Sequence, residues 1–165
     1  MPVPEFVTAL RHAVGSDHLL WLPGVNAVVT SPQGHVLLQR RSEDRLWSVL
    51  SGIVEPGEPP TVAVVREVYE ETGVTVEIER LTSVTVSPPR RHANGDMAQY
   101  LELTFRCRCV SDATAARVND DESLDIQWFA RDMLPELEPL IFQRVRHALS
   151  SDAEVLFADS TGTPV

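Results

Sequence analysis

The sequence predicts a single mixed α/β domain over residues 1–165, and three observations support that fold class. Segments with the pattern of strands lie on both sides of a helical segment, and further helical patterns lie near the two ends. The length of 165 residues suits one domain with a sizeable core. Hydrophobic residues make up 43% of the chain and charged residues 23%, which is typical of a globular protein.

The first elements are predicted to be a helix followed by a hairpin. Phe6, Leu10 and Val14 recur at i, i+4 and i+8 before Gly15, which predicts an amphipathic helix over residues 4–15. Apolar runs then favour strands, separated by a Ser-Pro-Gln-Gly turn, at residues 25–30 and 35–40. The polar and basic stretch that follows, residues 40–47, predicts a loop.

The middle of the chain is predicted to contain one helix and long strands. Residues 61–72 have a helical pattern between Pro59-Pro60 and Gly73, residue types that favour a helix start and stop. After it we expect one or two strands over 74–86, a loop with an Asn-Gly turn over 88–96, and an alternating strand over 97–110. One face of that last strand carries Leu101, Leu103, Phe105, Cys107 and Cys109. We interpret the two cysteines as small buried thiols rather than a disulfide or metal pair.

The last third is predicted to be a polar loop, a strand and a helix. The expected bounds are 113–122 for the loop, 124–129 for the strand and 139–149 for the helix. The tail from residue 150 to 165 has no clear pattern, and its structure is left open.

Charge and hydropathy exclude several classes of protein. The chain has 14 basic and 24 acidic residues, a net charge of −10, which argues against a general nucleic-acid binder. No apolar run approaches the roughly 18 residues of a membrane span, and the N-terminus lacks a signal-peptide pattern, so we expect a cytoplasmic protein. A phosphate-bearing ligand stays compatible with this charge if clustered acids hold divalent cations, because the metal inverts the local field.

The helical segment gathers such a cluster of acids. At about 100° per residue, Glu67, Glu70 and Glu71 fall in one sector of the helix, within a single turn. The opposite sector is expected to face the core and contains Val62, Val65, Val68 and Tyr69. Clustered carboxylates are the oxygen ligands that suit Mg²⁺, or alternatively Mn²⁺. The sequence therefore predicts a divalent metal site on this helix.

The stretch 52–74, GIVEPGEPPTVAVVREVYEETGV, resembles the Nudix box, G-x5-E-x7-R-E-U-x-E-E-x-G-U with U apolar. Every specified position is filled, by Gly52, Glu58, Arg66, Glu67, Val68, Glu70, Glu71, Gly73 and Val74. Seven of these positions require one residue type, so chance agreement is on the order of one in 10⁸ per starting point. The preceding Leu50-Ser51 replaces the Pro-Gly of many relatives, which leaves the shape of the entering loop open.

The resemblance implies an α/β/α sandwich with a mixed β-sheet and hydrolysis of a nucleoside diphosphate linked to another moiety. It implies metal ligation by Glu67, Glu70 and Glu71 beside the carbonyl of Gly52. Arg66 is expected to orient the carboxylates and Glu58 to support the metal shell. Dimers are frequent among members of this family, so a homodimer is left open.

The family often takes its general base from outside the box helix. Our first candidate is Glu122, just before a predicted strand, and a solvated loop is the equally weighted alternative for residues 119–122. Other candidates for the base are Asp120, Asp121, Glu102, Glu70 and Glu71.

Residues that bind the substrate are predicted from grouped basic side chains on both sides of the box. The candidates are Arg40, Arg41, Arg90 and Arg91, with Trp47 as a ring for stacking. The alternatives are surface loops that balance nearby acids, and a tryptophan that packs at the edge of the sheet. Pro88 and Pro89 resemble a proline found after the box in ADP-ribose-cleaving members, which favours ADP-ribose-type substrates. Hydrolysis of nucleoside triphosphates is the runner-up, and a non-catalytic nucleotide sensor is disfavoured by the complete set of box carboxylates.

Overall fold

The computed structural model describes residues 3–151, 154–159, 161 and 163. Its helices are α1 (Glu5–Val14), α2 (Pro60–Thr72) and α3 (Pro139–Leu149), with a short 3₁₀ turn, η1 (Ala113–Ala115). Its strands are β1 (Leu20–Thr30), β2 (Val36–Arg41), β3 (Trp47–Ser48), β4 (Leu50–Ile53), β5 (Val76–Val86), β6 (Arg90–Arg91), β7 (Met97–Cys109), β8 (Ser123–Phe129) and β9 (Leu156–Ala158).

All of these strands belong to one mixed sheet. Its central path runs β3-β2-β1-β7-β5-β9, while β4 pairs with β1, β6 with β7 and β8 with β2. β1 and β7 are parallel over their whole overlap, from Leu20 opposite Ala98 to Thr30 opposite Arg108. β5 and β9 are also parallel, and the other pairings are antiparallel.

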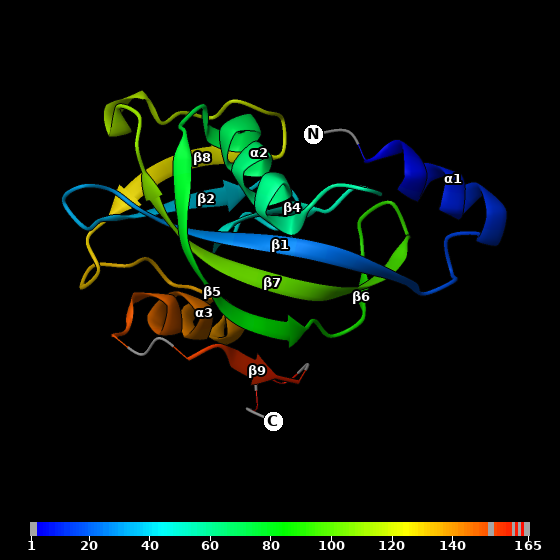
Figure 1. Ribbon diagram of the computed structural model, residues 1–165. Coiled ribbons are helices and arrows are strands. Elements are labelled where there is room, and N and C mark those ends of the chain that lie inside the picture. Colours follow the sequence, from blue (N-terminus) through cyan, green and yellow to red (C-terminus); the bar gives the residue numbers. More distant parts are fainter. Residues whose placement is uncertain (1–2, 152–153, 160, 162, 164–165) are drawn as a thin grey trace.

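The sheet is covered on both faces, with α2 on one side and α3 on the other (Figure 1). Because side chains alternate along a strand, Val25, Ala27 and Val29 of β1 pack into the core with α2. Val28 points the other way, into the core beneath α3 with Val145. Three layers, helix on sheet on helix, follow from this double burial, and the expected α/β fold class is confirmed.

The three predicted helices are present with bounds close to those expected. The face that α1 buries differs from the prediction, because Val7 is buried against Leu20 and Leu22 while Leu10 and Val14 are exposed. The helix lies at one end of the sheet (Figure 1), where Phe6 and Val7 pack and Arg11, in the last turn, donates to the carbonyl of Met97 on β7. In the described part of the chain, no helix has the length and apolar character needed to cross a membrane.

The long strands are present, and several short ones were not predicted. β6 lies in a stretch expected to be a loop, β3 begins at the last residue of another, and no strand was predicted at β4. Residues 76–86 form a single strand. Short strands of this kind depend on a neighbour to pair with, which local pattern does not reveal. β9 lies in the tail that had been left open, of which residues 152–153, 160, 162 and 164–165 are outside the described residues. Cys107 and Cys109 are buried free thiols, as predicted.

Candidate active site

The motif of residues 52–74 folds as strand, loop and helix over the α2 face of the sheet. β4 supplies Gly52, and α2 begins with Pro60, whose missing N–H costs nothing in a first turn. Gly73 ends the helix with φ 72°, in the left-handed region, and its N–H donates to the carbonyl of Tyr69 at 2.8 Å. The loop and helix are thereby fixed against β4 and β1.

The inner face of α2 contains carboxylates, which corrects the predicted orientation of the helix. The buried residues are Ala63, Val64, Val68, Thr72, Glu67 and Glu71. Of the four apolar residues expected in the core, Val68 is buried and Val65 packs against the core, whereas Val62 and Tyr69 are 53% and 56% exposed. Apolar residues occur on several sides of this helix, so their positions alone do not show which face packs against the sheet. Glu67 and Glu71 are accommodated there because the sheet provides space and hydrogen bonds.

The space for Glu67 comes from Gly52 on β4. A Cβ atom at Gly52 would lie 1.9 Å from Cδ of Glu67 and 2.1 Å from its Oε1. Any side chain at this position would therefore displace the carboxylate. The glycine allows the backbone of β4 to approach a buried carboxylate closely, and in the motif this is the reason for a glycine at position 52.

Arg66 holds the carboxylates of the loop and helix together. Its Nε and Nη2 donate to the two oxygens of Glu58, each at 2.9 Å, in a bidentate pair. Its Nη1 donates to Glu67 Oε1 at 2.9 Å and to Glu70 Oε2 at 3.2 Å. Its Nη2 also donates to the carbonyl of Ile53 at 3.3 Å. One guanidinium thus fixes three carboxylates and the strand β4.

Glu71 is held by a different set of partners from the sheet. Its Oε1 accepts from Gln39 Nε2 at 2.9 Å, and its Oε2 accepts from the N–H of Ser51 at 3.2 Å. Gln39 Oε1 in turn accepts from Ser123 Oγ at 2.7 Å. Gln39 was not predicted to be a site residue. It is a single glutamine at the end of the apolar run 36–39, and a polar side chain buried there needs a hydrogen-bond partner.

Burial and neighbouring acids disfavour the charged forms of Glu67 and Glu71. Burial raises the pKa of Glu67 to about 7, despite the opposing charge of Arg66, and the charges of Glu70 and Glu122 raise it further. Burial also raises the pKa of Glu71 well above its usual value, against the hydrogen bond from Gln39. In Glu58 the hydrogen bonds from Arg66 are the largest effect, and its pKa is lowered.

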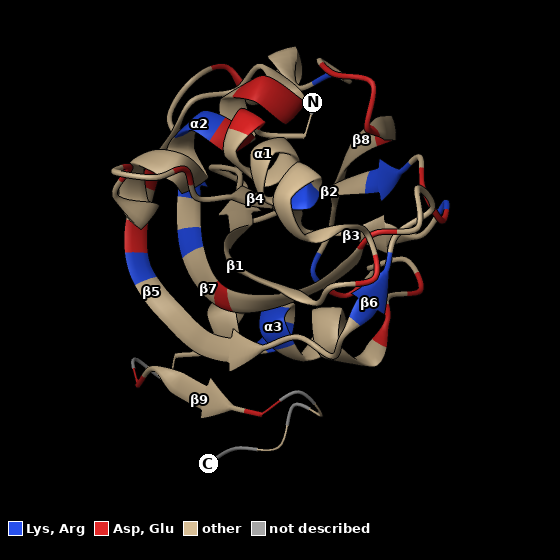
Figure 2. Ribbon diagram, turned by 90° about the vertical axis from the view of Figure 1, so that its right-hand side faces the viewer, with Lys and Arg blue, Asp and Glu red and all other residues tan. Residues whose placement is uncertain are grey.

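The segment before β8 brings further acids to the same place (Figure 2). Asn119 Nδ2 donates to the carbonyls of Tyr69 at 3.3 Å and Glu70 at 3.1 Å, and its N–H donates to the carbonyl of Glu71. The segment is thus tied to the last turn of α2. Asp120 and Glu122 are close enough that their charges raise the pKa of Glu71.

The oxygen atoms of these residues are of the type that binds a divalent metal ion, although the carboxylates are not already arranged around one position. Among the residues that the structure describes, no three Asp, Glu, His or Cys side chains are gathered at metal-ligand spacing. Arg66 and Gln39 hold the candidate ligands instead. The cradle at Gly52 and the buried carboxylates supply oxygen ligands only, which hard cations prefer, and a cation would offset their crowded charge.

An open cleft of about 610 Å³ lies beside the acidic cluster. From α2 it is lined by Arg66, Tyr69 and Glu70, and from the loop before the helix by Glu55. Val3, Pro4 and Glu5, in the segment that enters α1, line it as well, together with Asn119 and Asp120. A volume of this size is in the range of sites for small ligands, about 300–1,000 Å³.

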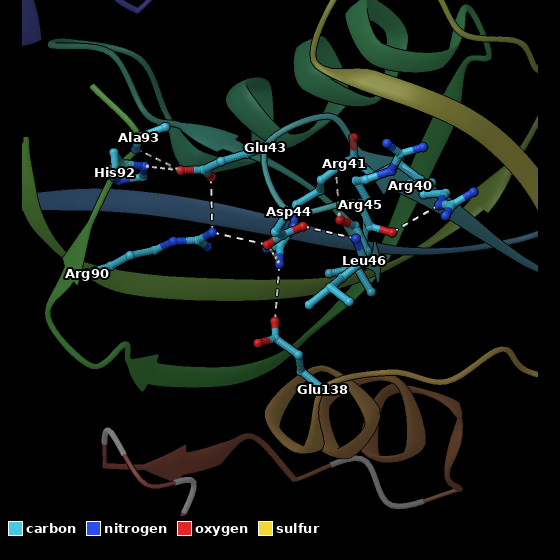
Figure 3. A network of polar contacts seen from close by, with 12 residues as sticks. Arg40, Arg41, Glu43, Asp44, Arg45, Leu46, Arg90, His92, Ala93 and Glu138 are labelled. Atoms are coloured by element: carbon cyan, nitrogen blue, oxygen red, sulfur yellow. Dashed lines mark hydrogen bonds and ion pairs between the residues drawn. The ribbon is translucent and has the colours of Figure 1, made fainter. Parts of the chain in front are cut away.

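Two of the basic residues predicted to bind substrate, Arg41 and Arg90, belong to one ion-pair network (Figure 3). Arg41 pairs with Asp44 and, at 3.2 Å, with Glu138 at the start of α3. Arg90 on β6 pairs with Glu43 at 3.0 Å and Asp44 at 3.2 Å. The turn of residues 42–46, the β6 hairpin and α3 are connected by these contacts.

The other predicted residues have separate surroundings. Arg91 pairs with Asp17 at 3.1 Å, and Arg40 Nε donates to the carbonyl of Arg45 at 3.0 Å. Trp47 packs edge-to-face on Phe129, with ring centroids 5.0 Å apart. A role for Arg40, Arg41, Arg90, Arg91 and Trp47 in binding substrate stays a prediction.

Glu102, an alternative general base, is held away from α2. It pairs with Arg144 of α3, and both side chains are largely buried in that contact. Because α3 covers the face of the sheet opposite α2 (Figure 1), Glu102 does not join the acidic cluster. Glu122 and Asp120 are the candidates that the fold brings close to it.

Comparisons with known proteins agree with this geometry. The family model described as the NUDIX domain matches residues 20–149. A MutT-like protein of Streptomyces ambofaciens is 33% identical over 112 residues, covering 68% of this chain and 66% of the relative. The RNA pyrophosphohydrolase of Caulobacter vibrioides is 33% identical over 136 residues, covering 73% and 78%. The crystal structure of an ADP-ribose pyrophosphatase from Streptococcus suis superposes with a TM-score of 0.60 at 22% identity, covering 82% of this chain and 98% of that one. The chain spans about two thirds of the length of the MutT-like relative.

Proposed function

Since this chain belongs to the Nudix family, we propose that it is a Mg²⁺-dependent hydrolase that cleaves a diphosphate linkage in a nucleoside diphosphate derivative. The observation that carries the proposal is the acidic cluster in which Arg66 joins Glu58, Glu67 and Glu70 beside an open cleft. The residues proposed to hold the metal are Glu67, Glu70, Glu71 and the carbonyl of Gly52, with Glu58 supporting them through Arg66. Mn²⁺ is the alternative ion.

The chain's own residues have distinct parts in the reaction. Arg66 holds Glu58, Glu67 and Glu70 close together before the metal ion and the phosphates bind. A divalent cation, when bound, neutralises charge on the phosphoryl oxygens and makes water easier to deprotonate. The oxygen of the water attacks one phosphorus, the P–O bond of the anhydride breaks, and two phosphate esters leave.

The proposed general base is Glu122, which takes the proton of the attacking water. Its support is the electrostatic influence of its charge on both Glu67 and Glu71. Asp120, which influences Glu71 in the same way, is the first alternative. Asp121, Glu70 and Glu71 remain further candidates for this step.

ADP-ribose-type compounds are the proposed substrates, with nucleoside triphosphates as the runner-up. The support is the position of Pro88 and Pro89 after the motif, and the fold shared with an ADP-ribose pyrophosphatase. The name of the Caulobacter relative, an RNA pyrophosphohydrolase, adds RNA as a rival substrate. A sensor that binds nucleotides without cleaving them is the competing class of function.

A substrate panel with one carboxylate variant tests the proposal. The protein is incubated with Mg²⁺ and ADP-ribose, ordinary and oxidised nucleoside triphosphates, dinucleoside polyphosphates, or 5′-triphosphorylated RNA, and the phosphate products are measured. We expect Mg²⁺-dependent turnover, fastest with ADP-ribose, and a loss of about 10²–10⁴-fold in Glu70→Gln. Binding without turnover of any compound would favour the sensor and overturn the enzymatic proposal.

A further inference from the structure

The cleft beside the acidic cluster is lined by chemically different residues. Glu70 and Asp120 belong to the lining, and Glu70 is one of the residues proposed to hold the metal ion. Tyr69, Val3 and Pro4 line the same cleft. A ligand whose phosphates bind beside Glu70 therefore shares the cleft with an aromatic residue and two apolar ones.

Tyr69 is an exposed aromatic residue without a packing role in the core. It is 56% exposed, whereas the buried face of α2 consists of Ala63, Val64, Val68 and the two glutamates. A single exposed aromatic residue is ordinary on a protein surface. Its position in the wall of an open cleft, one residue before Glu70, gives it a surface for a ligand ring.

The charges around the cleft limit what that ring can belong to. Among the described residues, Glu5, Glu55, Glu70 and Asp120 line it, and Arg66, the one basic residue among them, already pairs with three carboxylates. An additional phosphate beyond the metal-bound ones would be repelled by this lining. A neutral, planar group is compatible with it, and a nucleobase has both properties.

We propose that Tyr69 is a specificity-determining residue that stacks on the nucleobase of the substrate, in the cleft that Val3 and Pro4 also line. This inference rests on the proposed function, because the phosphates anchor the ligand. It deepens that function by requiring a neutral base next to the cleaved diphosphate. The arrangement disfavours an RNA chain in the cleft, since its phosphodiesters would lie against the acidic lining.

Binding of two ligands that differ by the base tests the inference independently of turnover. Affinities for AMP and for ribose 5-phosphate are measured by isothermal titration calorimetry in the presence of Mg²⁺. Stacking on an aromatic side chain is sequence-tolerant and substantial, so Tyr69→Ala is expected to weaken AMP about tenfold. Ribose 5-phosphate should bind equally to both proteins, and Tyr69→Phe should keep the affinity for AMP.

Val62→Ala is the matched control, because Val62 is 53% exposed on the same helix and does not line the cleft. An unchanged affinity of Tyr69→Ala for AMP would overturn the inference, while the Glu70→Gln result still decides the enzymatic proposal. The inference is also overturned if Val62→Ala lowers the affinity for AMP as much as Tyr69→Ala does. It is overturned as well if the wild type binds AMP no more tightly than ribose 5-phosphate. Absence of both ligand binding and turnover would overturn the two proposals together.

Discussion

The acidic cluster of α2 and the ion-pair network of the turn 42–46 are both built from arginines and carboxylates, yet their charge balance differs. In the first, Arg66 serves three carboxylates, and Glu71 is held without a cation. In the second, Arg41 and Arg90 share Glu43, Asp44 and Glu138. The first region sets four carboxylates against one arginine and raises the pKa of the two buried ones, so that a metal ion would favour their charged forms. The second sets three carboxylates against two arginines.

The difference teaches that residue types alone do not separate a binding site from a structural contact. Burial distinguishes the two regions here, because Glu67 and Glu71 are 4% and 2% exposed, while the acids of the network lie near the surface. Retaining buried carboxylates is costly unless they are paired or coordinate a metal. Surface pairs such as Arg90 with Glu43 contribute little to stability, and this pair connects β6 with the turn 42–46.

The largest expected effect separates the two arginines. Arg66→Lys keeps the positive charge but loses the bidentate contact with Glu58, so kcat/KM should fall by about 10–100-fold. Arg90→Lys, the matched change in the network, should leave kcat/KM within about threefold of wild type. A large rise in KM for Arg90→Lys would break the comparison and assign Arg90 to substrate binding.

A change in the backbone of β4 should come next. Gly52→Ala places a Cβ atom 1.9 Å from Cδ of Glu67, so we expect a loss of stability of about 1–3 kcal/mol and weaker activity. Gly24→Ala on the paired strand is the control, because its Cβ would meet nothing nearer than 3.7 Å. Urea unfolding of both variants measures the difference, and equal destabilisation would show that the cradle is not specific to Glu67.

The smallest expected effect is in the network. Burial alone would raise the pKa of Asp44, but the N–H of Leu46 and the guanidinium groups of Arg41 and Arg90 lower it overall. A carboxyl with a lowered pKa stabilises the fold above its ordinary pKa of 3.8, and this contribution is lost as the pH falls through the lowered value. Asp44→Asn should therefore cost at most about 1 kcal/mol near pH 7.

Unfolding by urea at several pH values between 7 and 3 checks this expectation. The stability difference between wild type and Asp44→Asn should shrink as the solution becomes acidic. A difference that grows on acidification would contradict the pairing of Asp44 with the two arginines.

Residues close together in the sequence were the easiest to predict. The spacing of Glu67, Glu70 and Glu71 fixes their proximity on any helix, and the pairing of Arg66 with Glu70 follows from i, i+4 geometry. The α3 bounds and the buried face of β7 were also predictable, because proline starts and strict alternation are local signals. These local rules gave the fold class and the acidic cluster.

Contacts between distant segments were not predictable from one sequence. The partner of Glu71 is Gln39, 32 residues away, and the partners of Arg90 are 46 and 47 residues away. The inner face of α2 was assigned incorrectly because Val62 and Tyr69 are apolar but exposed, and Glu67 is charged but buried. Such inversions arise where a site needs polar groups inside, and only the packed sheet reveals them.

The central claim, that the buried carboxylates of α2 hold a divalent cation, is tested most directly by Mn²⁺ binding. Electron paramagnetic resonance counts free Mn²⁺ as the ion is titrated into wild type, Glu67→Gln and Asp44→Asn. We expect wild type and Asp44→Asn to bind the ion alike, and Glu67→Gln to bind it at least about tenfold more weakly. Equal binding by Glu67→Gln and wild type, or no binding by wild type, would contradict the claim.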